Sequence, residues 1–551
     1  MKIKLWCLVL SFILITTGCV KDDLEDLQNQ IDDLNTKVDD LEQAQQEALL
    51  AAIADLEASL AALNSDLVAD LQLLEQEIAE NANAVYYGNV ITAADYDSLV
   101  AQGATIVTGK VVINNDDNIQ DLTGIKLIGK NLEINGGTTI TMESLQSVGE
   151  DLIITGVNTE ATLNLSMLSS IGGDFEIVSN TGLTEVITDE LVLVSGELFT
   201  ESNDMLTTLS FAKLDQVDEL HINGYWANDP EYLFYGAINY LDLSATNVSN
   251  DVLISYVGDV PAISFGEIGG DFEVEYTKIV EISVAASTIG GDFIIEYNAR
   301  LMAIEVPNLE TIDGELSVSF NDNSIFWNET ERSGLTTLPT FETLTFIGGD
   351  IQVINNGAIT SIESFNNVTE MTGANIDFSN NGSNIDNISI FNALVSTGAS
   401  AYSNASINIS EKTNWFDGFN MLENALNVRL TIQAPTEGGG GIGPFEVGGP
   451  VRVDGFASMT DLSTLFLDIK EATEFNAFPS LNNFKNYQEY LRVYMPLDEN
   501  VGMCTMEPIF TKIKSGDFEN WNGTRVAKFY MNWTEMDRDT AIDQLLAPCA
   551  L

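Results

Sequence analysis

The sequence predicts a mainly β protein, a parallel β-solenoid preceded by an N-terminal coiled-coil helix. An Ile-Gly-Gly-Asp segment and weaker copies of it recur at intervals of mostly 20–24 residues, and alternating apolar and polar residues follow them. Residues 22–82 contain no Gly or Pro and repeat apolar residues at helical spacing. A fixed period indicates stacked repeats, and the helical spacing indicates a coiled-coil seam. We therefore divide the chain into segments 1–18, 19–83, 84–453 and 454–551.

Segment 1–18 has the composition of a signal peptide. Two early lysines precede an apolar run over residues 5–15, and Thr16-Thr17-Gly18-Cys19 follows. The run is too short to span a bilayer comfortably. The ending resembles the lipobox of bacterial lipoproteins, although Thr16 stands where Leu is usual. The resemblance implies a lipid on Cys19; the alternative is an ordinary secretory signal.

The residues after Cys19 suggest where the chain is delivered. Lys21-Asp22-Asp23 resembles the export signal of Bacteroidota surface lipoproteins. This resemblance implies a lipid-anchored protein of the outer membrane, exposed at the cell surface. The periplasmic face of the same membrane is the alternative.

Segment 19–83 is expected to be a lipid anchor followed by a stalk. Its apolar residues follow the 3-4 spacing of a coiled coil, first at Leu24, Leu27, Ile31, Leu34, Val38 and Leu41. β-branched residues at one core position and Leu at the other favour a parallel homodimer, with a trimer as the alternative. A single helix folded back on the body is the other interpretation.

Segment 84–453 is expected to be the solenoid itself. Full copies of the repeat begin at Ile171, Ile268, Ile289 and Ile347. Weaker copies begin at Val107, Ile128, Val148, Val194, Gln216, Val248, Ile312 and Met371. Each Gly-Gly pair predicts a tight corner with positive φ, and the alternation after it predicts a strand with one buried face. Segment 454–551 then holds the final repeats and a C-terminal cap.

Asn recurs nine residues after many repeat starts. The positions are Asn180, Asn203, Asn298, Asn321, Asn356 and Asn380. An Asn at one fixed offset in each coil predicts a ladder that joins the backbone of one coil to the next.

The whole pattern resembles leucine-rich repeats, and more closely the receptor-L-domain-like repeats of Bacteroidota surface lipoproteins. The opening Tyr86-Tyr87-Gly88-Asn89-Val90 is similar to the N-terminal cap of that family. The resemblance runs from about residue 85 to at least residue 453. It implies an architecture and a location but no particular ligand.

Composition excludes several function classes. The chain of 551 residues has 22 Lys and Arg against 83 Asp and Glu, a formal net charge of −61, with one His and four Cys. Nucleic acid is therefore excluded as a partner, and a zinc site of several His and Cys is nearly so. We find no nucleophile motif, phosphate loop or metal-ligand spacing and predict that the protein is not an enzyme. Cys504 and Cys549 are expected to form a disulfide.

The candidate ligand-binding residues are aromatics in segments that follow strands. They are Tyr225, Trp226, Tyr232, Tyr235, Trp327 and Trp415. These residues fall in three segments of the chain. If all three segments emerge along one edge of the solenoid, the rings can stack on sugars or anchor a protein ligand. The alternative is that these segments fold back and use their aromatics as a small satellite core.

Carboxylates on the outward strand face are a weaker candidate. Glu275 and Glu296 share one offset on adjacent coils, beside Tyr276 and Tyr297. Stacked carboxylates repel each other, so they bind a cation such as calcium, raise a pKa or turn into water. A solvated acidic face is the more ordinary interpretation, and no cofactor other than calcium is expected.

We therefore predict a non-catalytic cell-surface lipoprotein that binds or adheres through a solenoid held off the outer membrane by a stalk. One alternative is an accessory glycan-binding protein of a SusCD-type uptake system. Another is a polysaccharide-cleaving enzyme on a β-helix, and a third is a surface-layer spacer.

Overall fold

The structure is a computed structural model in which the unit Asn83–Leu551 is compact. The residues that it describes are 83–114, 122, 124–137, 140–224, 238–322, 334–397, 406–433, 451–485, 489–496, 498, 500–518 and 526–550. The signal peptide, Cys19 and the predicted coiled coil lie outside the described residues and stay predictions. No described helix is long and apolar enough to cross a membrane.

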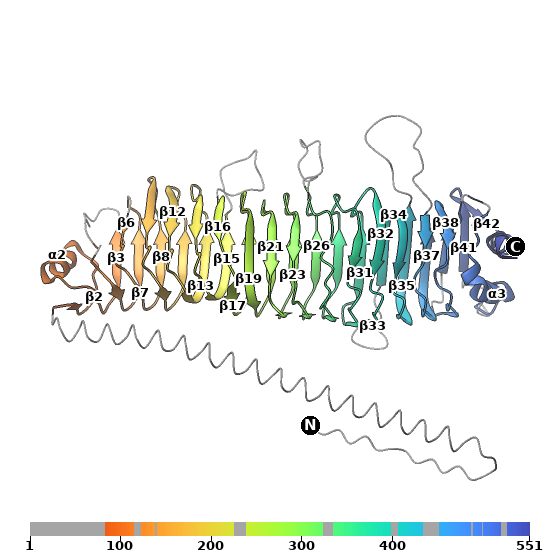
Figure 1. The fold of residues 1–551 in the computed structure, drawn as a ribbon, viewed down its shortest axis with the longest axis horizontal. Coiled ribbons are helices and arrows are strands. Elements are labelled where there is room, and N and C mark those ends of the chain that lie inside the picture. The colour runs from red at the N-terminus through yellow and green to blue at the C-terminus, as the bar shows by residue number, and fades with distance from the viewer. Residues whose placement is uncertain are drawn as a thin grey trace, which may run out of the picture. The chain divides into compact units, whose positions relative to one another are not determined.

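The unit from Asn83 onward is a stack of parallel-strand coils, the arrangement of a β-solenoid (Figure 1). Each coil contributes to a main row of strands, whose members pair side by side. These strands are β3 (Val111–Asn114), β5 (Leu132–Asn135), β8 (Leu152–Thr155), β11 (Phe175–Val178), β13 (Leu193–Glu201), β15 (Gln216–Asn223), β18 (Val252–Ser255), β20 (Phe272–Glu275), β23 (Phe293–Glu296), β26 (Leu316–Ser319), β28 (Ile351–Ile354), β31 (Asn375–Ser379), β34 (Ser406–Gly418), β35 (Asn424–Gln433), β37 (Asp461–Asp468), β40 (Glu489–Tyr494) and β41 (Val526–Met531).

A second row of short strands precedes the corner that leads into the main row, and β13, β15, β35 and β37 extend across both. Its separate members are β2 (Ile106–Val107), β4 (Leu127–Ile128), β7 (Ser147–Val148), β10 (Ser170–Ile171), β17 (Thr246–Val248), β22 (Thr288–Ile289), β25 (Thr311–Ile312), β27 (Phe346–Ile347), β30 (Glu370–Met371), β33 (Ser396–Thr397) and β39 (Asn483–Phe484).

A third row follows the main row in most of the described coils. It contains β6 (Ile140–Thr141), β9 (Ala161–Asn164), β12 (Leu183–Ile187), β14 (Thr208–Ser210), β16 (Tyr240–Asp242), β19 (Ala262–Ile268), β21 (Glu281–Val284), β24 (Ala303–Glu305), β29 (Ile362–Ser364), β32 (Ile385–Ile390), β36 (Val451–Val453) and β38 (Ala472–Phe475). Strand β34 is long enough to pair with β31 in the main row and with β32 in the third. These parallel pairings confirm a mainly β, solenoid-like fold.

The Gly-Gly corners are tight for a reason other than the one expected. Gly269 and Gly290 do not have positive φ. A Cβ on Gly269 would instead lie 1.9 Å from the carbonyl oxygen of Ser249, and one on Gly290 would lie 1.9 Å from the carbonyl oxygen of Gly269. Glycine is needed because the backbone of the preceding coil passes too close for a side chain.

The asparagine ladder forms at the corner after the main row. Asn180 donates through Nδ2 to the carbonyl of Ile154 (3.0 Å) and to Oδ1 of Asn203 (2.9 Å), and its backbone N–H also donates to that Oδ1 (3.2 Å). Asn298, Asn321 and Asn356 make the corresponding bonds. Because the amides are fully buried, they satisfy backbone groups that no water reaches.

One predicted member of the ladder is wrong. Asn381 takes the position that was expected for Asn380, which is exposed and has φ 59°. The first buried strand residue Ile351 lies four positions after Ile347, whereas Ile376 lies five positions after Met371. The extra residue moves the ladder position one step along the chain.

A column of buried phenylalanines runs inside the later coils. Its rings stack at centroid distances of 4.5–5.4 Å, and all its members have φ of 49–61°: Phe341, Phe365, Phe391, Phe419, Phe456 and Phe478. Positive φ is costly for a bulky residue. Burial of each ring at every turn offsets that cost, since a buried Phe contributes roughly 1.5–3 kcal/mol.

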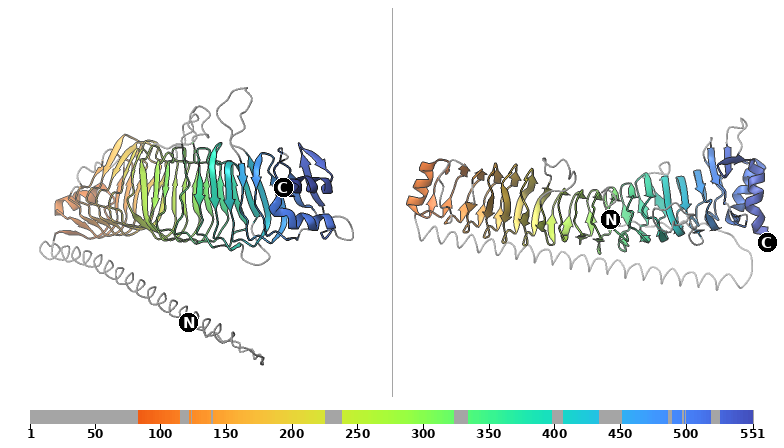
Figure 2. Two further views of the ribbon diagram at one scale, coloured as in Figure 1. Left: turned by 45° about the vertical axis from the view of Figure 1, so that its right-hand side comes forward. Right: turned by 90° about the horizontal axis from the view of Figure 1, so that it is seen from above.

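Helices cover both ends of the stack (Figure 2). Helix α2 (Ala93–Gln102) begins with a capping box between Thr92 and Asp95 and buries Tyr96 and Leu99 against the first coil. At the other end lie η2 (Cys504–Met506), α3 (Glu507–Ser515), α4 (Arg538–Leu546) and η3 (Ala547–Ala550). A disulfide joins Cys504 to Cys549 across this end.

The first and last strands differ in how they end the sheet. Strand β1 (Val85–Tyr86) pairs in parallel with β2. Strand β42 (Thr534–Met536) instead turns back and pairs antiparallel with β41. The parallel ladder of the described residues therefore stops at β41.

Candidate functional site

The outward face of the main row is a regular surface that extends along the stack of coils. In strands such as β11, β20 and β23, burial alternates, so that Phe175 and Ile177 enter the core while Glu176 stays half-buried on the outside. Side chains at equivalent outward positions therefore form columns, with neighbours about 4.8 Å apart.

Five of the six aromatics predicted from the sequence lie outside the described residues. Tyr225, Trp226, Tyr232 and Tyr235 belong to segment 225–237, and Trp327 belongs to segment 323–333. The described residues that lead into these segments, Gly224 and Asp322, both lie at the corner after the main row. The two segments therefore begin at the same side of the stack.

The sequence predicts that Trp415 lies in a segment that follows a strand. In the structure it lies inside β34. Its neighbour Phe416 is fully buried. The Trp415 side chain is 39% exposed, and its indole Nε1 donates to Oδ2 of Asp454 at 2.7 Å. The difference arises because β34 continues without a break from the main row into the third row.

A stack of aromatic rings stands between the starts of segments 225–237 and 323–333. Tyr256, Tyr276, Tyr297 and Phe320 occupy the corner position on four consecutive coils, and we call them the tyrosine ladder. Successive ring centroids lie 5.2, 4.7 and 4.6 Å apart, with ring planes within 9° of parallel. The rings cover one another's faces, and all four are half-exposed. Because the faces are covered, the exposed part of each ring lies at its edge.

Carboxylates lie beside the tyrosine ladder. Glu275 and Glu296 are neighbours in register on β20 and β23. Burial raises the pKa of Glu275, and the charge of Glu296 raises it further. The hydroxyl of Ser317 donates to Oε1 of Glu296. In the described part of the chain, no three His, Cys, Asp or Glu side chains come together as metal ligands, so the calcium candidate consists of this pair alone.

The single histidine has a structural environment. His221 lies on β15, with its ring 4.7 Å from that of Phe199 and its Nδ1 3.8 Å from Oε1 of Glu197. Burial lowers the pKa of His221, which favours the neutral ring. Glu197 in turn has a raised pKa through burial and the charge of Glu219. This group packs between coils, and nothing in it activates a nucleophile.

Toward the C-terminal end, the outward face changes from acidic to cationic and aromatic. Arg429, Phe466, Arg492 and Lys528 lie side by side on β35, β37, β40 and β41, and we call them the arginine patch. The Cζ atoms of Arg429 and Arg492 lie 4.7 and 5.8 Å from the centroid of Phe466. These four residues are too far apart in the sequence to be recognised there as neighbours.

Glu411 lies at the end of the asparagine ladder. It is 3% exposed, and its carboxyl group accepts from Nδ2 of Asn381 (2.6 Å) and from the backbone N–H of Asn381 (3.0 Å). Burial raises the pKa of Glu411 to about 8, and the hydrogen bonds from Asn381 oppose this rise. The carboxyl group is therefore protonated at neutral pH.

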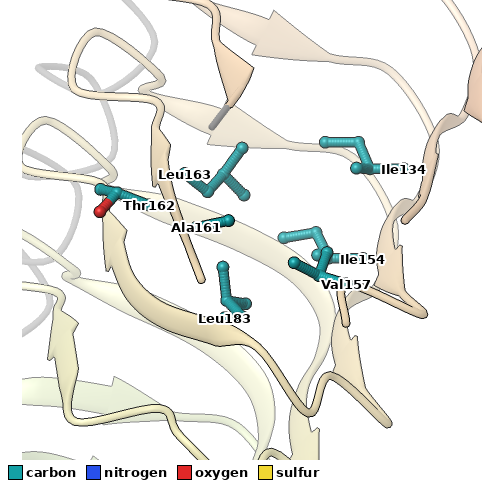
Figure 3. Close-up of a pocket in the computed structure, with 7 residues that line it drawn as sticks. All are labelled: Ile134, Ile154, Val157, Ala161, Thr162, Leu163 and Leu183. Carbon is teal, nitrogen blue, oxygen red and sulfur yellow. The ribbon is translucent and has the colours of Figure 1, made fainter. Parts of the chain in front are cut away.

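Cavities of two different kinds occur among the described residues. One of about 200 Å³ is lined by polar groups, including Asn380, Glu411, Lys412 and Gln433. The other is apolar and lies between coils, with Ile134, Ile154 and Leu183 among its lining residues (Figure 3). Its volume of about 10 Å³ is at the lower limit for one water molecule, so it is a gap in packing.

These observations define the class of the described unit as a parallel β-solenoid with aromatic and charged columns on its outward face. No protein-family model matches the chain, and no solved structure matches it.

Proposed function

We propose that the protein is a non-catalytic, lipid-anchored surface protein that captures an extracellular polymer along the outward face of its solenoid. The lipid anchor and the cell-surface location are inferred from Cys19 and Lys21-Asp22-Asp23, and the stalk is inferred from residues 22–82. The receptor-L-domain-like resemblance of the repeats supports the same proposal, since such solenoids present extended surfaces to partners.

The tyrosine ladder carries the proposal. Its hydroxyls and the carboxylates of Glu275 and Glu296 repeat at the strand spacing along one side of the stack. A polymer whose hydroxyl groups repeat at short regular intervals could form hydrogen bonds with these donors and acceptors, because both repeat at a similar spacing. This arrangement favours an extended neutral glycan, as expected of a glycan-binding accessory of a SusCD-type uptake system. A protein ligand is the alternative partner.

A glycan array probed with the full-length chain in detergent, with and without calcium, tests the proposal. The matched variants are Tyr276→Phe with Tyr297→Phe, which keep the ring stack but remove two hydroxyls, and Tyr240→Phe, which removes an exposed hydroxyl on β16. We expect neutral-glycan binding that only the first variant weakens. Binding to no glycan, together with retained attachment to host or matrix protein, would replace the glycan with a protein ligand. Absence of both would refute the binding function.

One observation favours the alternative of polysaccharide cleavage. Glu411 is protonated at neutral pH and lines a polar cavity, as a general acid would. Both hydrogen bonds to its carboxyl group come from the ladder residue Asn381, however, which assigns the group to coil packing. New reducing ends released by the wild type but not by Glu411→Gln would support cleavage over capture.

A further inference from the structure

We propose that the arginine patch binds sugar carboxylates of an extracellular polysaccharide that contains uronic acids. The inference rests on the proposed function, since it names a second ligand class and a second place on the same outward face. It requires that the patch be cationic, accessible and spaced for a polymer.

The distribution of charge along the chain sets this end apart. Residues 411–551 contain 11 of the 22 Lys and Arg but only 20 of the 83 Asp and Glu, a net charge of −9. The remaining 410 residues contain 11 basic and 63 acidic residues, a net charge of −52. At physiological salt, charges farther away than a Debye length of about 8 Å are largely screened, so a ligand interacts mainly with nearby charges. The arginine patch can therefore attract a carboxylate even though the whole chain is acidic.

Arg429 has its hydrogen-bonding capacity available. It is exposed, and no ion pair engages it among the described residues. Its contact with Phe466 uses the face of the guanidinium as a cation–π interaction. A cation–π contact of this kind does not use up the N–H donors of a guanidinium, whose planar fork matches a carboxylate.

The other two cations share one acidic neighbour. Glu489 accepts from Nε of Arg492 and lies 3.8 Å from Nζ of Lys528. Hydrogen bonding to Glu489 raises the pKa of Arg492, so its charge is held firmly. Three cations and one carboxylate leave the patch with a local excess of about two positive charges.

A group of aromatic side chains in mutual contact extends from the arginine patch. Phe466 contacts Tyr494 at 5.6 Å, Tyr494 stacks on Tyr530 at 5.0 Å, and Trp533 meets Tyr494 edge to face at 5.1 Å. Trp533 is 70% exposed, with Nζ of Lys470 4.3 Å from its ring centroid. An exposed indole beside cations suits a sugar ring that carries an acid group.

The spacing suits a polymer. Arg429, Phe466, Arg492 and Lys528 occupy consecutive strands, so Arg429 and Arg492 are separated by about two strand spacings, roughly 10 Å. That length is of the order of a disaccharide, so carboxylates on one glycan chain can meet both guanidinium groups. Nucleic acid, with one charge per about 1.7 Å of duplex axis, is more densely charged than a polyuronate with one charge per sugar, so the acidic rest of the chain repels nucleic acid more strongly.

The test measures the affinity of the full-length chain for polygalacturonate and for the neutral glycan that binds best on the array. The variants are Arg429→Gln and Arg492→Gln, with Arg300→Gln as the control. Arg300 is an exposed arginine that forms an ion pair with Asp259. This ion pair lies several coils away from the arginine patch. We expect each patch variant to weaken polygalacturonate binding by about tenfold or more, because a charge-assisted hydrogen bond is lost. Arg300→Gln and the neutral glycan should show no change.

Arg429→Lys separates geometry from charge. It keeps the cation but loses the fork, so part of the loss should remain. Equal melting temperatures of the variants and the wild type exclude unfolding as the cause. Polygalacturonate binding that survives both Gln variants would overturn the inference, as would binding only to poly-glutamate peptide. If the neutral glycan binds and polygalacturonate does not, this inference fails while the proposed function stands.

Discussion

Replacing Glu411 with Gln should remove most of one pH-dependent contribution to stability. The folded protein holds this carboxyl group with a pKa of about 8, against 4.5 in the unfolded chain. Between these values the unfolded state is ionised and the folded state is protonated, so the unfolded state binds fewer protons. Stability therefore falls as pH rises from 4.5 to 8 and is level outside that window. At pH 7 the contribution is about 3 kcal/mol against folding.

The amide oxygen of Gln can accept from Nδ2 and from the backbone N–H of Asn381, as Oε1 of Glu411 does at 2.6 and 3.3 Å. The 3.0 Å bond from the same N–H to Oε2 is lost in the variant, because the amide NH₂ group is a donor. Urea unfolding followed by far-UV circular dichroism at pH 5 and pH 8 measures the effect. We expect the Gln variant to gain stability relative to wild type as pH rises, by a few kcal/mol across the window. Parallel pH profiles for the two proteins would refute the reasoning.

Three further changes test the packing of the coils, each by urea denaturation. Asn203→Ala should destabilise by about 2–4 kcal/mol, because it leaves buried ladder groups without partners; a loss below 0.5 kcal/mol would contradict this role. Phe391→Ala should cost about 3–5 kcal/mol by opening a cavity in the phenylalanine column, and a value near zero would mean that the column collapses freely. Gly269→Ala should be strongly destabilising, since its Cβ would lie 1.9 Å from a carbonyl oxygen, whereas Gly124→Ala meets nothing within 4 Å and should be neutral.

The repeat period predicted the stacked parallel strands because it states directly how often the backbone returns to the same place. The ladder at Asn180, Asn203 and Asn298 followed from the same counting. Counting failed at Asn380, where one extra residue in the corner moves the buried amide to Asn381. A period alone does not reveal such an insertion; the exposed or buried state of the flanking residues does.

Other features needed the coordinates. The phenylalanine column has a signal in the sequence, Phe-x-x-Leu at Phe341, Phe391 and Phe419, but its variable spacing hides it from a search for a fixed period. The arginine patch was missed because Arg429, Phe466, Arg492 and Lys528 come from four separate segments. Only the strand register shows that these residues are neighbours.

The short reversed strand β42 has a consequence for how copies of the molecule meet. A stack of parallel coils with an open last turn would be a template on which another copy could dock and extend the ladder without limit. By folding Thr534–Met536 back against Phe529–Met531, the chain pairs this half of the β41 edge with its own strand. Addition of another copy's parallel strand is therefore disfavoured along the part of β41 that β42 covers.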